Sequence, residues 1–491
     1  MCGATWRYPV AVRAECVGAN RRPLSGLFLS MLLGCAGCGA LDDAEQPSAA
    51  SGGHAGSDPG GTGQWIQGGQ ANAGGQGGQA NHGGSSVGAS TTAPDMDRVD
   101  VVEKGLCKIR VGCDAAIIDT PPVQCTFELA DESGTKSYVD YATMNLRGRS
   151  SIKFPKKNYA LELCDAAGQE HPANLLQMGQ ESDWILDGAW ADRSFMRNRL
   201  TFALYREMDE SRWAPQARYC ELELNGSNAG IYVLVEKIKR DDDRIKLPED
   251  DGTGATFIVR QDDLGTLNLS IGAGSKWQVV YPSGTHITAE QTQAVQAWLD
   301  RLGTAMRSTE PSDLLKLLDP AAMIDWILVQ ELAKNIDAYN LSLYFVRNAG
   351  GLAWPVPWDI DLAYGQPTLR DGDNELPQGW VHTRTVLITQ LSANPTIRAG
   401  LGTRWRALRT GLLSDAAITA RLDAYAALLD PAALARNFAL WPIEDVDFVQ
   451  YYAPYSFYDV TSYDEELSHL RSWIKNRLTW IDANIDQYPS K

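Results

Sequence analysis

The side chains best suited to chemistry in this sequence lie between Asp337 and Asp361. Asp337 and Asn340 stand before one apolar segment, and Asp359 and Asp361 follow a second one. Carboxylate and carboxamide oxygens are hard ligands, which suit Mg²⁺ and the phosphate esters that it binds. The sequence therefore predicts a magnesium and phosphate site where the chain brings these four residues together.

A β-hairpin between the two pairs is expected to bring them together. Residues 341–347 and 352–358 are rich in apolar and aromatic side chains, and Asn348–Gly351 between them is a turn signal. A fold-back centred between the second and third turn residues places Asn340 opposite Asp359. Directly opposed residues of antiparallel strands have Cβ atoms about 5 Å apart. The oxygen ligands would then gather at the open end of the hairpin.

Pro355 and Pro357 occupy alternate positions of the second predicted strand. Their missing N–H groups face the same side, which predicts a strand at a sheet edge, facing a cleft. Asp359 and Asp361, as alternate residues of that strand, would face the same way. A structural interpretation also stays open, in which the acids cap loops or pair with arginines such as Arg347.

The part of the chain before about residue 240 is predicted to be mainly β-structure. Alternating or short apolar runs mark residues 107–111, 123–129 and 159–163 as strands. Asn225-Gly226 is a strong hairpin signal between two further alternating segments, 218–224 and 229–237.

Helices are predicted within and after this part. Residues 193–208 form an amphipathic pattern with Asp192 as N-cap. Asp319-Pro320 opens a helix that ends near Lys334, and the capping box Ser462-x-x-Glu465 opens the last helix. The expected fold class is therefore α+β, with a β-rich N-terminal part and a helix-rich C-terminal part.

The N-terminal segment predicts export. Arg21-Arg22 precedes an apolar run, Leu24–Leu33, that is too short to span a bilayer and reads as a secretory signal. The ending Leu-Leu-Gly-Cys resembles a bacterial lipobox, which implies that residues 1–35 are a lipoprotein signal peptide and that Cys35 becomes lipidated. Cys38 is a second candidate, and a plain signal peptide or a short buried helix is the alternative. The expected location is the bacterial cell envelope, on its periplasmic or surface side, with a lipid anchor in the membrane.

Residues 36–95 are dominated by Gly, Ser, Ala, Asn and Gln, which cannot bury enough apolar surface to offset their ordering entropy. They are predicted to be a disordered tether, followed by one folded domain over residues 96–491. Five cysteines lie in that domain, and export permits disulfides. One or two bridges are expected, within the region of Cys107 to Cys125, with at least one thiol left free.

Composition disfavours several classes of function. The formal net charge is −17 and the pI is about 4.9, so the long-range field opposes a nucleic-acid partner. The sequence contains neither H-E-x-x-H nor G-x-S-x-G, so zinc proteolysis and α/β-hydrolase chemistry have no motif to support them.

A basic segment lies between two predicted strands. Arg147-Gly-Arg-Ser-Ser is followed by Phe154-Pro-Lys-Lys, a combination of cationic side chains, hydroxyl groups and a glycine. Such a loop can bind an anion. A solvated basic hairpin is the other interpretation.

Four groups of residues, in order along the chain, resemble motifs of the CotH (spore-coat protein H) kinase-like family. The family motifs are R-G-N-S-S…P-K-K-x-Y, D-W-x-L…D…R-N, N-G…G-x-Y…E-K and a closing set of acids. The matching residues here are Arg147–Tyr159, Asp183–Asn198, Asn225–Lys237 and Asp337–Asp361.

The resemblance implies an atypical bilobal fold similar to that of protein kinases, which binds ATP with Mg²⁺ or, in its place, Mn²⁺. In protein kinases a catalytic Asp and a metal-binding Asn precede a metal-binding Asp. By that likeness Asp337 orients or deprotonates the acceptor hydroxyl, Asn340 and Asp359 hold the metal, and Asp361 assists.

The same resemblance assigns the remaining site residues. Lys156 or Lys157 would neutralise the phosphates of ATP, with Arg147 close to them. Glu236 would be an acid of the hinge strand or a structural acid near the nucleotide.

Three functions are consistent with these patterns. The first is phosphoryl transfer from ATP to a hydroxyl of a secreted or surface protein by a CotH-type kinase. The second is a non-catalytic surface or coat-assembly scaffold, which keeps the fold and presents it to a partner protein. The third is a hydrolase that uses Asp337 and Asp359 as paired carboxylates, which leaves the basic segment without a role.

Overall fold

The computed structural model describes residues 103–261, 265–268, 276–283, 286–339, 341–366, 375–381, 386–443 and 460–488. They fall in one compact unit, Val87–Lys491. The predicted signal peptide, the lipidation site Cys35 and the tether lie outside the described residues, as does Asn340.

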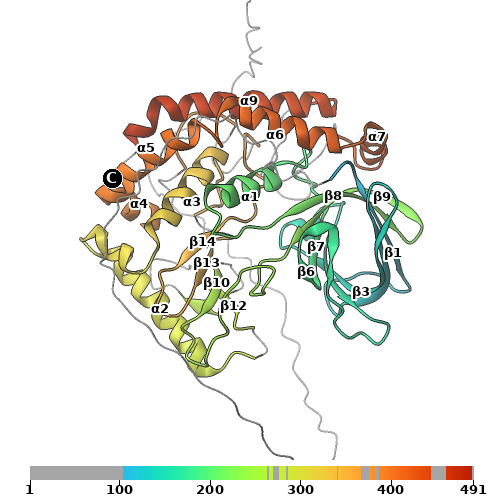
Figure 1. Ribbon diagram of the computed structural model, residues 1–491, viewed down its shortest axis with the longest axis horizontal. Helices are drawn as coiled ribbons and strands as arrows, with labels where there is room; N and C mark the ends of the chain where they lie inside the picture. Colours follow the sequence, from blue (N-terminus) through green and yellow to red (C-terminus); the bar gives the residue numbers. More distant parts are fainter. Residues whose placement is uncertain are drawn as a thin grey trace, which may run out of the picture. The chain divides into compact units, whose positions relative to one another are not determined.

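Seven strands of the described N-terminal part close into a barrel in the order β1-β2-β3-β4-β7-β9-β8 (Figure 1). Neighbours are antiparallel except β1 and β8, which run parallel and close the barrel. The strands are β1 Cys107–Cys113, β2 Val123–Ala130, β3 Lys136–Arg147, β4 Asn158–Cys164, β7 Asp183–Asp187, β8 Ala217–Leu224 and β9 Ser227–Glu236. A two-residue pair, β5 Ala173–Asn174 and β6 Gln180–Glu181, lies in the β4–β7 connection.

The barrel encloses its own apolar core, because side chains alternate between its two faces. In β1, for example, Ile109 and Val111 are buried while Lys108 and Arg110 are exposed. The interior is filled by residues such as Phe127, Leu161, Trp184, Leu222 and Leu234. The predicted Asn225-Gly226 hairpin is confirmed as the turn between β8 and β9.

Two disulfides join neighbouring barrel strands. Cys113–Cys125 links β1 to β2 and confirms the bridge expected in this region. Cys107–Cys220 links β1 to β8 across the parallel seam that closes the barrel. Its second cysteine lies outside the predicted region, since the two strands are adjacent only in the folded barrel. Cys164 is a buried free thiol.

A second sheet has the order β11-β12-β10-β13-β14. Its strands are β10 Phe257–Gln261, β11 Leu267–Asn268, β12 Lys276–Tyr281, β13 Tyr344–Arg347 and β14 Trp354–Val356. The position of β14 at the sheet edge agrees with the prediction from the two prolines.

The predicted hairpin forms, but two details of the prediction were wrong. Tyr344 pairs with Val356, so the register differs by one residue, and the turn closes with a bond from Gly351 N–H to Asn348 O. The ladder also ends at this pair, so Asp359 and Asp361 lie in a turn rather than on a strand. Contacts with distant segments hold that turn, and these contacts are invisible in a hairpin pattern.

The C-terminal part is mainly helical (Figure 1). Its helices are α2 Ala289–Arg307, α3 Pro320–Ala333, α4 Val386–Ala393, α5 Pro395–Arg409, α6 Asp415–Leu428, α7 Pro431–Leu440 and α9 Tyr463–Asn484, and α1 Arg197–Met208 precedes them between β7 and β8. Short 3₁₀ turns are η2 Ser151–Lys153, η3 Leu175–Gln177, η4 Pro311–Lys316 and η6 Ile485–Gln487. The α+β fold class, β-rich before and helix-rich after, is confirmed.

The predicted caps of α3 and α9 are confirmed, whereas that of α1 was wrong. Asp319 and Ser462 each accept a hydrogen bond from the first turn of their helix. Helix α1 begins at Arg197, later than predicted, because the Asp192 carboxylate instead accepts bonds from the backbone N–H groups of Ser194 and Arg197. The irregular segment between them is thereby fixed before the helix starts.

The helices and the second sheet share an apolar core separate from the barrel interior. It includes Leu200 of α1, Trp326 of α3, Phe345 of β13 and Ile474 of α9. Among the described residues, no helix combines the length and the apolar character needed to cross a membrane.

The long disulfide is expected to stabilise the fold more than the short one. The chain-entropy model gives about 4.7 kcal/mol for a loop of roughly 100 residues and about 3 kcal/mol for one of roughly 15. The sequence separations are 113 for Cys107–Cys220 and 12 for Cys113–Cys125. Replacing the Cys107 pair by serines should therefore lower the free energy of unfolding, measured with denaturant, by more than replacing the Cys113 pair. Equal losses of unfolding free energy in the two double-serine variants would contradict this prediction.

Candidate functional site

The turn that carries Asp359 and Asp361 is held by two helices. The Asn198 side-chain oxygen, in the first turn of α1, accepts a bond from Ile360 N–H at 2.8 Å. Arg197 Nε donates to Ala363 O at 3.0 Å, and Tyr364 N–H donates to Ala333 O, at the end of α3, at 2.7 Å. The acidic turn is therefore fixed by backbone contacts to α1 and α3 on either side of Asp361.

Asp359 adopts a strained conformation at the surface of this turn. Its φ is +63°, in the left-handed region, and its carboxylate is exposed. Ser342, also left-handed with φ +55°, donates from Oγ to Asp359 Oδ2 at 3.0 Å. Non-glycine residues in this region cost free energy and are concentrated at functional sites. The Asp359 side chain is therefore accessible, and Ser342 orients its carboxylate.

Asp337 is placed against the same turn by Asn335. Helix α3 ends at Lys334 in a left-handed cap, and the chain then turns through Asn335. The Asn335 side chain accepts from Asp337 N–H at 3.1 Å and donates to Asp359 O at 3.4 Å. One buried carboxamide thus sets the spacing between the two acidic segments that the sequence singled out.

Five aspartates lie in one another's electrostatic field at this site. The pKa of Asp361 is raised well above its ordinary value, first by burial and then by the carboxylates of Asp359, Asp187, Asp192 and Asp337. Carboxylates held this close resist being ionised together. The structure therefore brings together the three predicted acids that it describes, and it adds two that were not predicted.

Asp187 is one of the two aspartates that the structure adds to the predicted site. It ends β7, and its carboxylate accepts from Ala189 N–H at 2.8 Å and from Asn198 Nδ2 at 3.4 Å. Its pKa is raised, mainly by burial, while the positive charge of Arg147 acts in the opposite direction. The only sequence signal for Asp187 is its position directly after the Asp183-Trp-Ile-Leu motif, which does not indicate that it faces Asp359.

Arg147, from the basic segment, lies close to the acidic turn. Its guanidinium carbon lies 5.7 Å from the centre of the Trp358 ring, next to Asp359 in the chain. Burial lowers the pKa of Arg147, and Tyr344, Asp187 and Asp359 are the neighbours that favour its charge. A cation from the end of β3 therefore faces the acids that follow β14.

The two lysines of the basic segment make contacts of a different kind. The Lys156 ammonium is buried and donates to Ile231 O and to Asn437 Oδ1 of α7, the latter at 2.9 Å. It also lies 5.0 Å from the ring centre of Tyr232, and burial lowers its pKa to about 7. Lys157 Nζ donates to Ile152 O at 2.8 Å. Each ammonium is thus engaged with protein oxygens in the structure.

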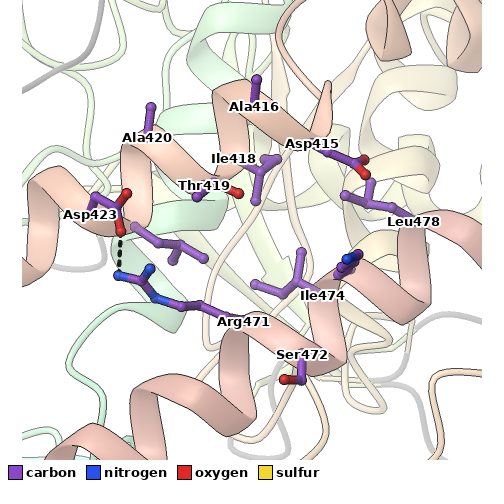
Figure 2. Close-up of a pocket in the computed structure, with 12 residues that line it drawn as sticks. Asp415, Ala416, Ile418, Thr419, Ala420, Asp423, Arg471, Ser472, Ile474 and Leu478 are labelled. Carbon is purple, nitrogen blue, oxygen red and sulfur yellow. Dashed lines mark ion pairs between the residues drawn. The ribbon is translucent and has the colours of Figure 1, made fainter.

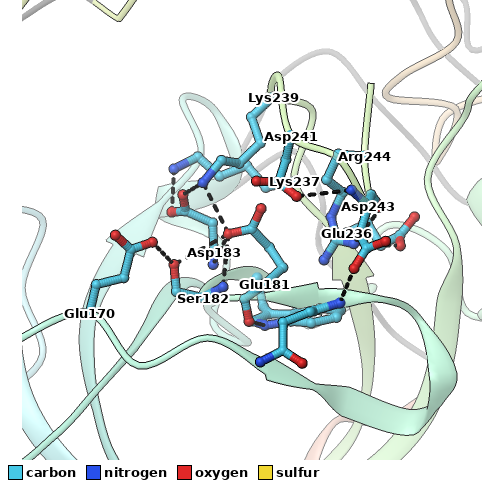
Figure 3. Close-up of polar contacts among 12 residues, drawn as sticks. Glu170, Glu181, Ser182, Asp183, Glu236, Lys237, Lys239, Asp241, Asp243 and Arg244 are labelled. Atoms are coloured by element: carbon cyan, nitrogen blue, oxygen red, sulfur yellow. Dashed lines mark hydrogen bonds and ion pairs between the residues drawn. The ribbon is translucent and has the colours of Figure 1, made fainter. Parts of the chain in front are cut away.

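Glu236 lies in a buried ion pair at the end of β9. Its carboxylate accepts from Arg244 Nη1 at 2.9 Å (Figure 3). It also accepts from Gln216 N–H at 2.7 Å. Burial raises the pKa of Glu236 to about 7, and the Arg244 guanidinium opposes that shift. Arg244 in turn stacks 4.5 Å from the ring centre of Trp184 in the barrel. These contacts join β9 to the loop that follows it.

The acidic side chains of this site suit Mg²⁺ better than a metal ion whose ligands all come from the protein. Across the described residues, no three His, Cys, Asp or Glu side chains converge closely enough to hold a metal ion. Mg²⁺ commonly takes only one or two carboxylates and completes its shell with substrate phosphates and water. Asp359 and Asp361 can supply those carboxylates, and Asn340, the predicted third ligand, lies outside the described residues.

A separate pocket of about 600 Å³ lies between α6 and α9 (Figure 2). Its floor is apolar, with Ile418 and Ile474, and an ion pair between Asp423 and Arg471 at 2.5 Å joins the two helices. None of the predicted site residues lines it. The pocket is therefore distinct from the acidic site.

The match to a known protein family covers the part of the chain that contains the acidic site. The family model described as CotH kinase protein matches residues 144–481, which include every described residue of the acidic site. The inner spore coat protein H of Bacillus subtilis (strain 168) is 24% identical over 186 residues, 37% of this chain. The match spans about half of that relative, 49% of its length.

The charge of Asp361 is expected to destabilise the metal-free protein. Its folded pKa lies above the unfolded one, so its contribution to stability is largest at low pH and is lost as pH rises from the unfolded to the folded pKa. Asp361→Asn should therefore raise the free energy of unfolding at pH 7, by on the order of 1 kcal/mol. The same variant should lose most of the stabilisation that Mg²⁺ or Mn²⁺ gives the wild type. Urea unfolding with chelator or with metal measures both effects.

The control for this experiment is Asp114→Asn, which changes an exposed carboxylate far along the chain. A metal-free Asp361→Asn protein less stable than wild type would refute the carboxylate repulsion at the site.

Lys156 is expected to make stability rise with pH. Because its folded pKa of about 7 lies below the ordinary lysine value of 10.5, the unfolded chain binds more protons between these values. The contribution of Lys156 to the free energy of unfolding should increase from pH 7 to pH 10. Lys156→Met removes that contribution, so its destabilisation relative to wild type should grow over this range, whereas the exposed Lys153→Met should show no such trend. Denaturant titrations at pH 7 and 9.5 would reveal a flat difference if the ammonium were solvated.

Proposed function

This chain belongs to the CotH kinase family, and we propose that it is an atypical protein kinase. Its reaction would transfer the terminal phosphoryl group of ATP to a hydroxyl of a secreted or surface protein. Mg²⁺ would accompany the nucleotide, and Mn²⁺ could replace it. The acceptor would be a coat or surface protein, since the relative's name places that protein in the inner spore coat.

One observation carries the proposal. Asp337, Asp359 and Asp361 come from two segments, yet Asn335 bonds to both, and Arg147 from the barrel faces them. Phosphoryl transfer needs positioning and charge neutralisation more than covalent chemistry, which is what acids, a metal and a guanidinium supply. A hydrolase that uses paired carboxylates would not need Arg147.

The side chains would divide the work as follows. Asp359 and Asp361, with Asn340, would hold the metal, which when bound neutralises charge on the phosphates. Asp337 would orient the acceptor hydroxyl and accept its proton. Arg147 would contact a phosphate oxygen with its planar fork of donors. Lys156, which its pKa of about 7 leaves partly charged at neutral pH, would add positive potential from its buried position, and a charged Asp187 would favour that charge.

A bilobal, kinase-like arrangement is part of the same proposal. The barrel has an interior core of its own, and the helices share a second core with the five-stranded sheet and with residues of β7, β8 and β9 such as Val233. Arg147 ends a barrel strand, while Asp337 follows α3 and Asp359 follows β14. A nucleotide held by both sets would lie between the barrel and the helical part, as between the lobes of protein kinases.

Export and anchoring complete the proposal. Two disulfides are typical of proteins that fold in an oxidising compartment. Lipidation at Cys35 and the tether over residues 36–95 would then present the domain at the cell envelope. The net charge of −17 favours a protein partner over nucleic acid.

A coat-assembly scaffold without catalysis is the second candidate. The relative's printed name, a spore coat protein, favours it, and so does the engagement of the Lys156 ammonium by Asn437. In that function the domain would bind a coat or surface partner and the acidic site would have no turnover.

Transfer of labelled phosphate from ATP to protein tests the kinase. We expect wild type to label itself or an added envelope protein in a metal-dependent manner, with losses of at least 100-fold in Asp337→Ala and Asp359→Ala. Asp114→Asn, at the exposed barrel loop, should retain full activity. ATP with Mg²⁺ at 100 times its Kd should also add about 2.7 kcal/mol of stability.

The absence of any stabilisation by nucleotides with Mg²⁺ or Mn²⁺ would decide for the scaffold. Labelling that persists in both alanine variants would refute the kinase proposal, because the transfer would not depend on the acidic site.

A further inference from the structure

Tyr344 lies next to two arginines that come from different sheets. On the second sheet, Arg260 of β10 is the direct cross-strand partner of Tyr344 on β13. Arg260 Nη1 donates to the Tyr344 hydroxyl at 3.4 Å, and its Nε donates to Gln278 Oε1 at 2.8 Å. These two contacts help to orient the Arg260 guanidinium along the sheet.

Arg147, at the end of barrel strand β3, lies close to Tyr344 and to its aromatic neighbour Trp358. Its guanidinium lies 5.7 Å from the ring centre of Trp358, and the rings of Trp358 and Tyr344 meet edge to face at 6.4 Å. Phe202 of α1 stacks on Trp358 at 5.7 Å and supports it. Tyr344 is the first of the neighbours that favour the charge of Arg147, and Arg260 is a like-charged neighbour that opposes it.

Asp359 and Asp187 are the acids that favour the charge of Arg147, and Arg260 is the cation that opposes it. Two half-buried guanidinium groups in one field repel each other, and an anion placed between them would reverse that cost. Arg is suited to this because its rigid fork of N–H groups matches the oxygens of a phosphate. A polyphosphate that shares its metal with Asp359 has two negative groups to distribute over such a pair.

We propose that Arg260 is a second phosphate-binding arginine, which with Arg147 holds the polyphosphate of a nucleotide beside Asp359. The inference rests on the proposed function for the identity of the nucleotide. The pair itself is defined by its contacts with Tyr344 and Trp358. Arg260 lies outside the basic segment, and the connection between the two arginines arises only from the folded sheets.

The test measures binding of ATP, of inorganic tripolyphosphate and of adenosine, each with Mg²⁺, by titration calorimetry. A charge-assisted hydrogen bond contributes about 1.5–3 kcal/mol, so Arg260→Gln should weaken ATP and tripolyphosphate about 10-fold or more. Adenosine binding should be unchanged, because it carries no phosphate. Arg260→Lys, which keeps the charge and loses the fork, should weaken both phosphates by an intermediate factor.

Arg347→Gln is the matched control on the neighbouring strand. Arg347 donates to the carbonyl oxygens of Ala255 and Gly351 at the turn end of the hairpin. The Arg347→Gln protein should therefore bind all three probes as wild type does. Circular dichroism and urea unfolding establish that each variant is folded. If Arg260→Gln does not fold, the comparison of Arg260→Lys with wild type decides.

The outcomes separate this inference from the kinase proposal. Unchanged ATP and tripolyphosphate affinity in the Arg260 variants of an active kinase would overturn the inference and leave the function. Arg260-dependent binding of tripolyphosphate in a protein without phosphoryl transfer would support the pair and remove the function. A wild type that binds neither phosphate overturns both. Weaker binding of the phosphorylated acceptor with normal ATP affinity would assign Arg260 to the product's phosphate and overturn the proposal as stated.

Discussion

The arrangement of this protein depends on one fully buried guanidinium, that of Arg197. Its Nη1 donates to Asp192 Oδ1 at 2.6 Å and to Glu466 Oε1 of α9 at 2.9 Å, and its Nε donates to Ala363 O. Removing one partner of a buried pair leaves an uncompensated charge, at a cost of about 3–5 kcal/mol. Arg197 therefore holds the segment before α1, the acidic turn and the last helix together.

This constraint makes the strained site possible. An aspartate in the left-handed backbone region and several carboxylates close together both cost free energy. They persist only where surrounding contacts offset that cost. Arg197 and Asn198 hold the acidic turn from α1, while Ala333 and Asn335 hold it from the end of α3. The strain at Asp359 is therefore sustained by hydrogen bonds from α1 and from the end of α3, and the Asp359 side chain stays exposed.

The barrel is joined to the helical part through α7. Asn437 Oδ1 accepts from Lys156 Nζ and from Ile231 N–H, and Trp441 Nε1 donates to Ala229 O on the same strand. The close approach requires Gly230, because a Cβ there would meet Asn437 Oδ1 at 2.5 Å. Through this contact a helix late in the chain sets the position of the basic segment that contributes Arg147.

The sequence by itself determined the features that depend on neighbours along the chain. The Asn225-Gly226 turn, the caps at Asp319 and Ser462, the edge strand with its prolines and the order of the family motifs could all be predicted, because each is decided by residues a few positions apart. Tertiary structure alone decided the one-residue register of the hairpin, the late start of α1 and the Cys107–Cys220 bridge. It alone brought Asp187 to the acids, placed Arg260 beside Tyr344, and buried Lys156 and Glu236. These outcomes depend on hydrogen bonds, ion pairs and packing between segments far apart in the chain, which no local pattern encodes.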